Sequence, residues 1–166
     1  MFVMIVGGGK AGSHLTGQLI SEGHQVRLIE IRQDVADRLK ADFPGPVVIC
    51  GDGSAPRVLE EAGIHQADVL TALTGEDETN LVVTTLGRFE YHIARTIARV
   101  NNPKNAWLFN AEMGVDVGLN QTDILTRLIK EEMSVGDMMT LLKLRTGDFA
   151  IVEEKLPPHS KIVGIP

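Results

Sequence analysis

Short runs of apolar, often β-branched residues recur along the chain and alternate with segments of helical periodicity. The apolar runs cover residues 2–6, 25–31, 47–50, 68–73, 96–100 and, more weakly, 115–119. Runs that are apolar almost without interruption are typical of parallel strands buried on both faces. The pattern therefore predicts six strands of one parallel sheet.

The segments between these runs place apolar residues three or four positions apart, as amphipathic helices do. The positions that define them are Leu15, Leu19 and Ile20 in the first segment, Val35, Leu39 and Phe43 in the second, and Leu81, Val82, Leu86 and Phe89 in the fourth. The third segment runs from Ser54, a candidate N-cap, to Ala62, and Gly63 ends it. Strand–helix alternation with right-handed crossovers predicts an α/β fold, a doubly wound, Rossmann-like sheet.

The character of the chain changes after Gln121. Residues 1–121 are predicted to form the Rossmann-like domain, residues 122–146 a helical arm rich in Leu, Ile and Met, and residues 147–166 the start of a further domain. The arm can form a helix pair that packs on its own sheet. It can also bury its apolar face in a second subunit, since Met-rich surfaces adapt well to partners.

Composition excludes several classes of protein. The net charge of −6 and the lack of a basic stripe argue against binding to nucleic acid. A single cysteine, Cys50, excludes an internal disulfide framework and a cysteine-based zinc site, and no pair of histidines has metal-ligand spacing. No apolar run approaches the roughly 20 residues of a membrane span, so we expect a cytoplasmic protein that does not insert into the membrane.

A glycine-rich turn follows the first strand and opens the first helix. It reads G-x-G-x-x-G and comprises Gly7, Gly8, Gly9, Lys10, Ala11 and Gly12. In this context the glycines permit a tight turn, close approach to a pyrophosphate and close packing of helix on strand, while the helix N-terminus attracts the anion. Glu30 at the end of the second strand is placed to accept hydrogen bonds from both ribose hydroxyls. The glycine-rich turn and Glu30 together predict a binding site for a dinucleotide or a mononucleotide.

The residues beside Glu30 bear on the choice of cofactor. A carboxylate at this position repels a 2′-phosphate, which disfavours NADP, although Arg32 partly offsets the repulsion. Ile31 lies between the two and is included in the predicted site. We expect NAD(H) or an adenine nucleotide such as ATP, ADP or AMP.

Further candidates follow the third, fourth and fifth strands, at the sheet edge where ligands of such folds bind. They are Gly51, Asp52 and Gly53, then Leu73, Thr74, Gly75 and Asp77, and finally Arg99. Thr74 and Asp77 can instead form a capping box for the next helix. Arg99 can reach a phosphate or remain a solvated side chain.

The alternative function is that of a small NAD-dependent oxidoreductase. Such an enzyme needs an acid or base that faces the substrate. None of the histidines (His14, His24, His65, His92 and His159) has a partner at useful spacing, and we assign no catalytic residue and no metal ligand.

Five motifs taken together resemble one family. They are GGGKAG at 7–12, the acid of LIEI, GDGSAPRVLEEAG at 51–63, ADVLTALTGEDETNL at 67–81 and GVD at 114–116. The chain is similar in these motifs to the RCK domain, also called KTN or TrkA-N, the cytosolic nucleotide-binding regulator of potassium channels and of Trk/Ktr potassium uptake. The resemblance covers roughly residues 1–135, and the tail is similar to the start of the family's C-terminal ligand domain.

The resemblance implies a regulatory subunit that is not an enzyme. It implies NAD, NADH, ATP, ADP or AMP at the glycine loop, with Glu30 as the ribose acid where aspartate is commoner, Asp52 on the adenine side and Arg99 as the basic residue. It also implies homodimers paired through helices after the sixth strand, and rings on a potassium channel or transporter at the inner face of the membrane. Ligand binding would change the dimer geometry.

Overall fold

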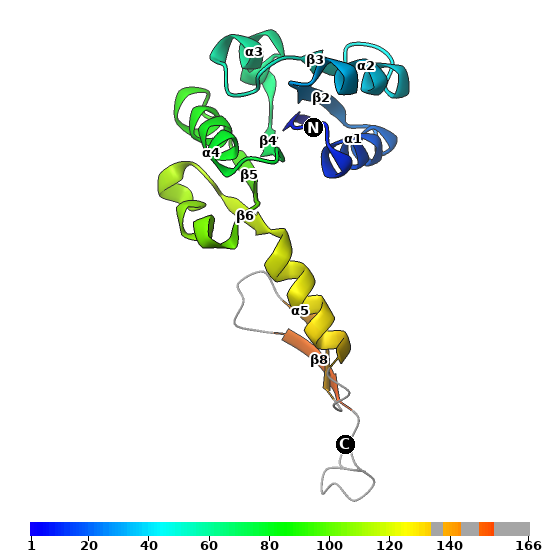
Figure 1. Ribbon diagram of the computed structural model, residues 1–166, viewed down its shortest axis with the longest axis vertical. Coiled ribbons are helices and arrows are strands. Elements are labelled where there is room, and N and C mark those ends of the chain that lie inside the picture. The colour runs from blue at the N-terminus through cyan, green and yellow to red at the C-terminus, as the bar shows by residue number, and fades with distance from the viewer. Residues whose placement is uncertain (134–137, 144–149, 155–166) are drawn as a thin grey trace, which may run out of the picture. The chain divides into compact units, whose positions relative to one another are not determined.

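The computed structural model of this 166-residue chain describes residues 1–133 together with the backbone of 138–143 and 150–154. It comprises two compact units, Met1–Thr122 and Asp123–Pro166. The first unit alternates strands with helices (Figure 1): β1 (Phe2–Val6), α1 (Lys10–Ser21), β2 (Gln25–Glu30), α2 (Gln33–Asp42), β3 (Val48–Cys50), α3 (Pro56–Glu61), β4 (Val69–Ala72), α4 (Asp77–Thr85), β5 (Arg95–Val100) and β6 (Val117–Asn120).

The six strands form one parallel sheet in the order β3-β2-β1-β4-β5-β6. The predicted doubly wound, Rossmann-like fold is thereby confirmed. Strand order reverses between β1 and β4, where Val6 is paired with Ala72 at the strand ends. An open sheet of this kind has its crevice at such a reversal, outside the carboxyl ends of the strands.

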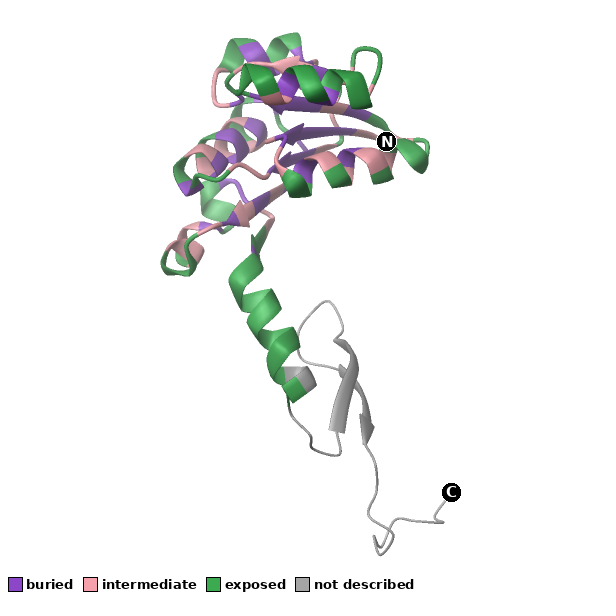
Figure 2. Cartoon of the chain, turned by 45° about the vertical axis from the view of Figure 1, so that its right-hand side comes forward, coloured by how far each residue is buried: buried purple, intermediate pink, exposed green. Residues whose placement is uncertain are grey.

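Each face of the sheet has its own apolar core, because successive strand residues point to opposite faces. Val3 and Ile5 of β1 pack on the face covered by α1 and α2, while Met4 and Val6 pack on the face covered by α3 and α4. Figure 2 shows the buried residues concentrated in the strands and on the inward sides of the helices. The two layers hold the carboxyl ends of the strands in fixed positions.

Two local predictions were wrong, the helix cap at Ser54 and the buried face of the fourth helical segment. Helix α3 begins at Pro56 with Ala55 as its N-cap, so Ser54 is not the cap. Asp52 instead binds Ser54 in the preceding turn. The apolar side chain that α4 buries fully is Val83, whereas Val82 is exposed, as is Phe89 in the helical turn Leu86–Glu90 that follows, because the helix is rotated relative to the predicted face.

The second unit contains the rest of α5 (Gln121–Met133) and an antiparallel pair, β7 (Met138–Lys143) and β8 (Ala150–Glu154). The helical arm predicted over 122–146 is therefore wrong over Met138–Lys143, where β7 pairs with β8, and its residues 134–137 and 144–146 lie outside the described residues. Five exposed apolar side chains mark one stripe of α5: Ile124, Leu125, Leu128, Ile129 and Met133. Among the residues described, no helix is long and apolar enough to cross a membrane.

Candidate functional site

A cavity of about 270 Å³ opens at the carboxyl ends of the strands, where the strand order reverses. Its walls come from the ends of β1, β2, β3 and β4 and from the first turn of α4. Eleven predicted site residues line it: Gly7, Gly9, Glu30, Ile31, Arg32, Gly51, Asp52, Gly53, Leu73, Thr74 and Gly75. The structure thus brings four separate loops of the sequence to one place.

The glycine loop has the geometry that its spacing predicted. Gly7 has a φ of 109°, and a Cβ there would lie 2.9 Å from the backbone of Leu73 and Thr74. A Cβ on Gly12 would overlap the carbonyl oxygen of Gly7, so only glycine lets α1 approach the strand end. Gly9 has no atom within 4 Å of the position of a Cβ. The backbone of Gly9 is therefore open to a ligand beside the N-terminus of α1.

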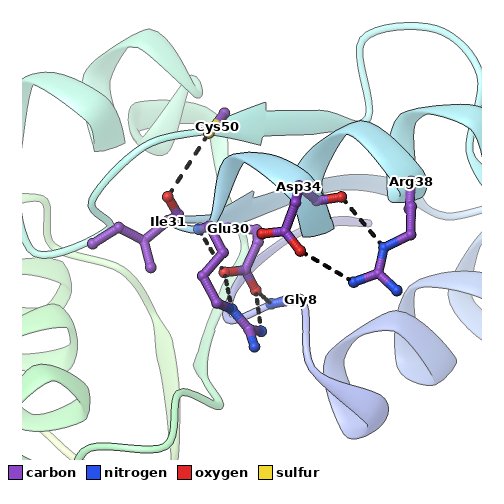
Figure 3. A network of polar contacts seen from close by, with 7 residues as sticks. Gly8, Glu30, Ile31, Asp34, Arg38 and Cys50 are labelled. Carbon is purple, nitrogen blue, oxygen red and sulfur yellow. Dashed lines mark hydrogen bonds and ion pairs between the residues drawn. The ribbon is translucent and has the colours of Figure 1, made fainter.

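Glu30 is the buried carboxylate of the cavity, with only 3% of its side chain exposed. Its Oε2 accepts a hydrogen bond from the backbone N–H of Gly8 at 2.8 Å, and its Oε1 accepts one from the backbone N–H of Arg32 at 2.9 Å. The Arg32 guanidinium donates from Nε to Oε1 at 2.9 Å and from Nη2 to Oε2 at 3.0 Å. Figure 3 shows Glu30 directed toward Gly8.

Two opposing effects act on the pKa of Glu30. Burial raises this pKa. The hydrogen bonds from Arg32 and Gly8 and the charge of Arg32 lower it by more, so that the pKa of Glu30 lies below its ordinary value. The same pair raises the pKa of Arg32. Glu30 is therefore ionised at neutral pH.

The loop after β3 is shaped by its own acid. Asp52 Oδ1 accepts from the backbone N–H of Ser54 at 2.9 Å and from its hydroxyl at 2.7 Å. A Cβ on Gly53 would overlap the side chain of Val6, so the loop lies against the end of β1. This contact places Asp52 on the cavity wall together with Glu30.

Thr74 and Asn80 join the ends of β4 and β5. Asn80 is fully buried, and its Oδ1 accepts from the backbone N–H and the hydroxyl of Thr74 at 2.9 and 2.7 Å. Its Nδ2 donates to the carbonyl of Arg99 at 2.9 Å. Thr74 is not a helix cap: α4 begins at Asp77, and Glu76 is its N-cap. The hydroxyl of Thr74 is instead held at the cavity.

Asp77 lies outside the cavity lining, and the fold uses its carboxylate. Oδ1 accepts from the backbone N–H of Asn101 at 2.6 Å, while Oδ2 accepts from the backbone N–H of Asn102 and from Nδ2 of Asn105 at 3.0 and 2.8 Å. Burial raises the pKa of Asp77, but these bonds lower it to below its ordinary value. The residue fixes the loop after β5, and a ligand contact there stays a prediction.

The other predicted residues outside the cavity lining are Gly8, Lys10, Ala11, Gly12 and Arg99. Gly8 contributes to the site by donating its backbone N–H to the carboxylate of Glu30. Lys10 is exposed at the start of α1. The Nε of Arg99 is buried and lacks a hydrogen-bond partner within the part of the chain that the structure describes. A buried cationic donor of this kind suits an anionic group, as the glycine loop does.

Five residues of the lining were not predicted: Val6, Ile29, Ser54, Glu76 and Thr79. Ser54 belongs to a loop that the sequence singled out, and its signal was assigned to a helix cap. Glu76 and Thr79 follow the fourth strand, and Thr79 donates its hydroxyl to Glu76 at 3.0 Å. Both lie close in sequence to the predicted Thr74 and Gly75, and this closeness was the signal that could have found them. The two strand residues carry none, because they read only as core.

Relatives of known name match the whole chain. The TrkA-N domain family matches residues 3–121. The "Trk system potassium uptake protein TrkA" of Mycobacterium tuberculosis is 37% identical over 166 residues, which is 100% of this chain and 74% of that protein. The "Trk system potassium uptake protein TrkA homolog" of Methanothermobacter thermautotrophicus is 37% identical over 164 residues, covering 99% of this chain and 74% of the relative.

Solved structures share the fold at lower identity. The TrkA-N domain of inner membrane protein ybaL from Escherichia coli superposes with a TM-score of 0.72 at 18% identity, covering 80% of this chain and 96% of that one. GsuK bound to ADP gives a TM-score of 0.67 at 22% identity over 80% of this chain and 34% of the other. The GsuK channel bound to NAD gives 0.64 at 23% identity, over 84% and 25%. By motifs, fold and relatives, the chain belongs to the TrkA-N domain family.

Proposed function

We propose that the cavity binds the adenosine half of an adenine nucleotide, either NAD(H) or ATP, ADP or AMP. The observation that carries the proposal is the buried carboxylate of Glu30, which faces the cavity beside the open backbone of Gly9. Ribose hydroxyls would donate to Glu30, and the phosphates would lie at the glycine loop and the N-terminus of α1. ADP and NAD in the GsuK structures support this choice of ligand.

NADP is the disfavoured cofactor. An ionised Glu30 repels a 2′-phosphate, and desolvating two negative charges side by side is costly. Arg32 reduces this repulsion but is already paired with Glu30. We expect NAD to bind at least tenfold more tightly than NADP, which corresponds to about 1.4 kcal/mol.

The proposed role is control of potassium transport without catalysis. The relatives named as TrkA potassium uptake proteins support this role over that of an oxidoreductase, although oxidoreductases share the Rossmann-like fold. We propose a cytoplasmic location, at the inner face of the membrane through a potassium channel or transporter. Hydride transfer from NADH to a substrate at ordinary enzyme rates would contradict this role.

The apolar stripe of α5 supports a homodimer. Ile124, Leu125, Leu128 and Ile129 are each about half exposed, and this amphipathic helix would bury them against the same helix of a second copy. Such dimers can assemble further into a ring. For nucleotides to control the partner, they must bind two dimer geometries with different affinity, since equal affinity shifts nothing.

One set of calorimetric titrations tests the ligand assignment. NAD, NADH, ATP, ADP and NADP are titrated into the same preparation of the full chain. We expect at least one of the first four to bind in the micromolar range and NADP to bind more weakly. Absence of binding by all of them would contradict the proposed function.

Sedimentation tests the dimer separately. Leu128→Glu places a charge in the apolar stripe of α5, and Lys130→Glu places the same side chain on the opposite side of this exposed helix. We expect the first variant to be monomeric and the second to remain dimeric. A dimer of unchanged affinity in Leu128→Glu would show that the stripe is not the interface.

A further inference from the structure

The hydrogen-bonding capacity of Glu30 is already filled by its own chain. A carboxylate offers about four acceptor positions on its two oxygens. The backbone N–H groups of Gly8 and Arg32 take one position on each oxygen, and the Arg32 guanidinium takes one further position on each through Nη2 and Nε. Two ribose hydroxyls therefore find no unused acceptor on Glu30.

The four donors differ in how easily they can leave. The backbone N–H of Gly8 is held by the glycine turn, and the backbone N–H of Arg32 is held at the start of α2. The guanidinium belongs to a side chain that is 57% exposed, and among the described residues its hydrogen bonds go only to the two oxygens of Glu30. Two mobile donors thus occupy the positions that two hydroxyls would need.

Room exists for the guanidinium outside the cavity. Arg32 lines both the cavity and a second hollow beside α1 and α2, which Gly8, Lys10, Arg38 and Asp42 also line. Its side chain can therefore leave Glu30 and remain at the surface, where water solvates the charge. The exchange of two guanidinium bonds for two hydroxyl bonds leaves the carboxylate fully satisfied.

We propose that Arg32 competes with ribose for Glu30, so that every nucleotide must displace its guanidinium to bind. This inference rests on the proposed nucleotide site. The cost of this displacement lowers the affinity of every ribose-containing ligand by the same factor. Ligands that also place phosphates on the glycine loop overcome this factor, whereas a nucleoside has no such compensation. The competition thus lowers the affinity for nucleosides and nucleotides alike, and the phosphate contacts of a nucleotide offset that loss.

Adenosine and ADP titrated into Arg32→Ala test the proposal. We expect both ligands to bind more tightly than to the unmodified chain by the same factor, on the order of three- to tenfold, because hydrogen-bonded ion pairs at a surface are worth little more than this. Arg38→Ala is the matched control, since Arg38 pairs with the exposed Asp34 and not with Glu30 (Figure 3). It removes the same charge and should leave adenosine affinity unchanged.

Two further observations keep the test decisive. Arg32→Lys retains the charge but cannot donate to both oxygens of Glu30 in the same way. Its adenosine affinity should therefore lie between that of the unmodified chain and that of Arg32→Ala. In NMR spectra, the Nε–H signal of Arg32 should be protected from exchange in the free protein and lose that protection when ADP saturates the site.

The outcomes separate the two proposals. Equal or weaker adenosine binding by Arg32→Ala would overturn the competition while leaving the nucleotide site in place. A loss of ADP affinity without loss of adenosine affinity, beyond the change in Arg38→Ala, would also overturn it, because Arg32 would then hold a phosphate. If neither the unmodified chain nor Arg32→Ala bound any adenine ligand, the proposed function itself would fail.

Discussion

Glu30 and Asp77 are two buried carboxylates near the carboxyl ends of strands in one sheet, and they serve different ends. Each accepts several hydrogen bonds, and in each these bonds outweigh burial and lower the pKa. Glu30 lines the cavity, whereas Asp77 does not. The residue type and its burial therefore do not distinguish a ligand site from a structural support.

The difference lies in the donors. Half of the donors to Glu30 belong to the guanidinium of one exposed side chain, which a ligand can replace. The donors to Asp77 are two backbone N–H groups and the amide of Asn105, all held within the loop after β5. A carboxylate with exchangeable donors can bind a ligand, and one with fixed donors stabilises the fold.

The largest effect is expected from removing the fixed support. Asp77→Ala leaves three donors near the α4 N-terminus without an acceptor, and it should lower the free energy of unfolding by about 3 kcal/mol in urea titrations followed by circular dichroism. Glu78→Ala removes an exposed charge from the same turn and should change it by less than about 0.5 kcal/mol. Equal stability of the two variants would show that Asp77 does not support the loop.

Removing the exchangeable site should act on binding. Glu30→Ala is expected to weaken ADP binding about thirtyfold, or about 2 kcal/mol, because two charge-assisted hydrogen bonds to ribose are lost. The control Asp34→Ala removes a carboxylate that is 79% exposed on α2 and should leave the calorimetric affinity unchanged. Unchanged affinity in Glu30→Ala would mean that the ribose lies elsewhere.

Acid should reveal the lowered pKa values of both carboxylates. A carboxyl whose pKa is lower in the folded state stabilises the fold above its unfolded pKa, about 3.9 for Asp and 4.3 for Glu, and this contribution is lost as the pH falls through the folded pKa. In Asp77→Asn and Glu30→Gln, stability below about pH 4 should depend less steeply on pH, by up to about 1.4 kcal/mol per pH unit. Curves of denaturation midpoint against pH that parallel those of the unmodified chain would contradict this.

The smallest effect is expected from a single donor. Asn105→Ala removes one of the three bonds to Asp77 and should lower the free energy of unfolding by about 1 kcal/mol, with ADP affinity unchanged. Lys104→Ala, exposed in the same turn, provides the comparison in the same urea titration. A change in ADP affinity in Asn105→Ala would mean that the two carboxylates are coupled.

Much of this arrangement could be predicted from the sequence because its signals are local. The glycine spacing and an acid at the end of the second strand indicate one turn and one strand end, so Gly7, Gly12 and Glu30 could be placed together. The third and fourth loops could be placed because a parallel sheet brings all carboxyl ends to one edge.

The remainder depends on contacts between distant segments. Asp77 reads as a cap or a ligand contact until the loop 101–105 is seen to donate to it, 24 or more residues along the chain. Likewise, the sequence sets Arg32 two positions from Glu30 but does not show that its guanidinium fills both oxygens. The strand at Met138–Lys143 was predicted as helix because a short apolar run fits either period.

A crystal structure of the full chain with ADP tests the central claim most directly. The account predicts that both ribose hydroxyls lie within hydrogen-bonding distance of the Glu30 carboxylate, that the diphosphate lies over Gly9 at the start of α1, and that Asp77 keeps its bonds to the loop after β5. ADP bound with its ribose away from Glu30, or outside the cavity, would contradict it.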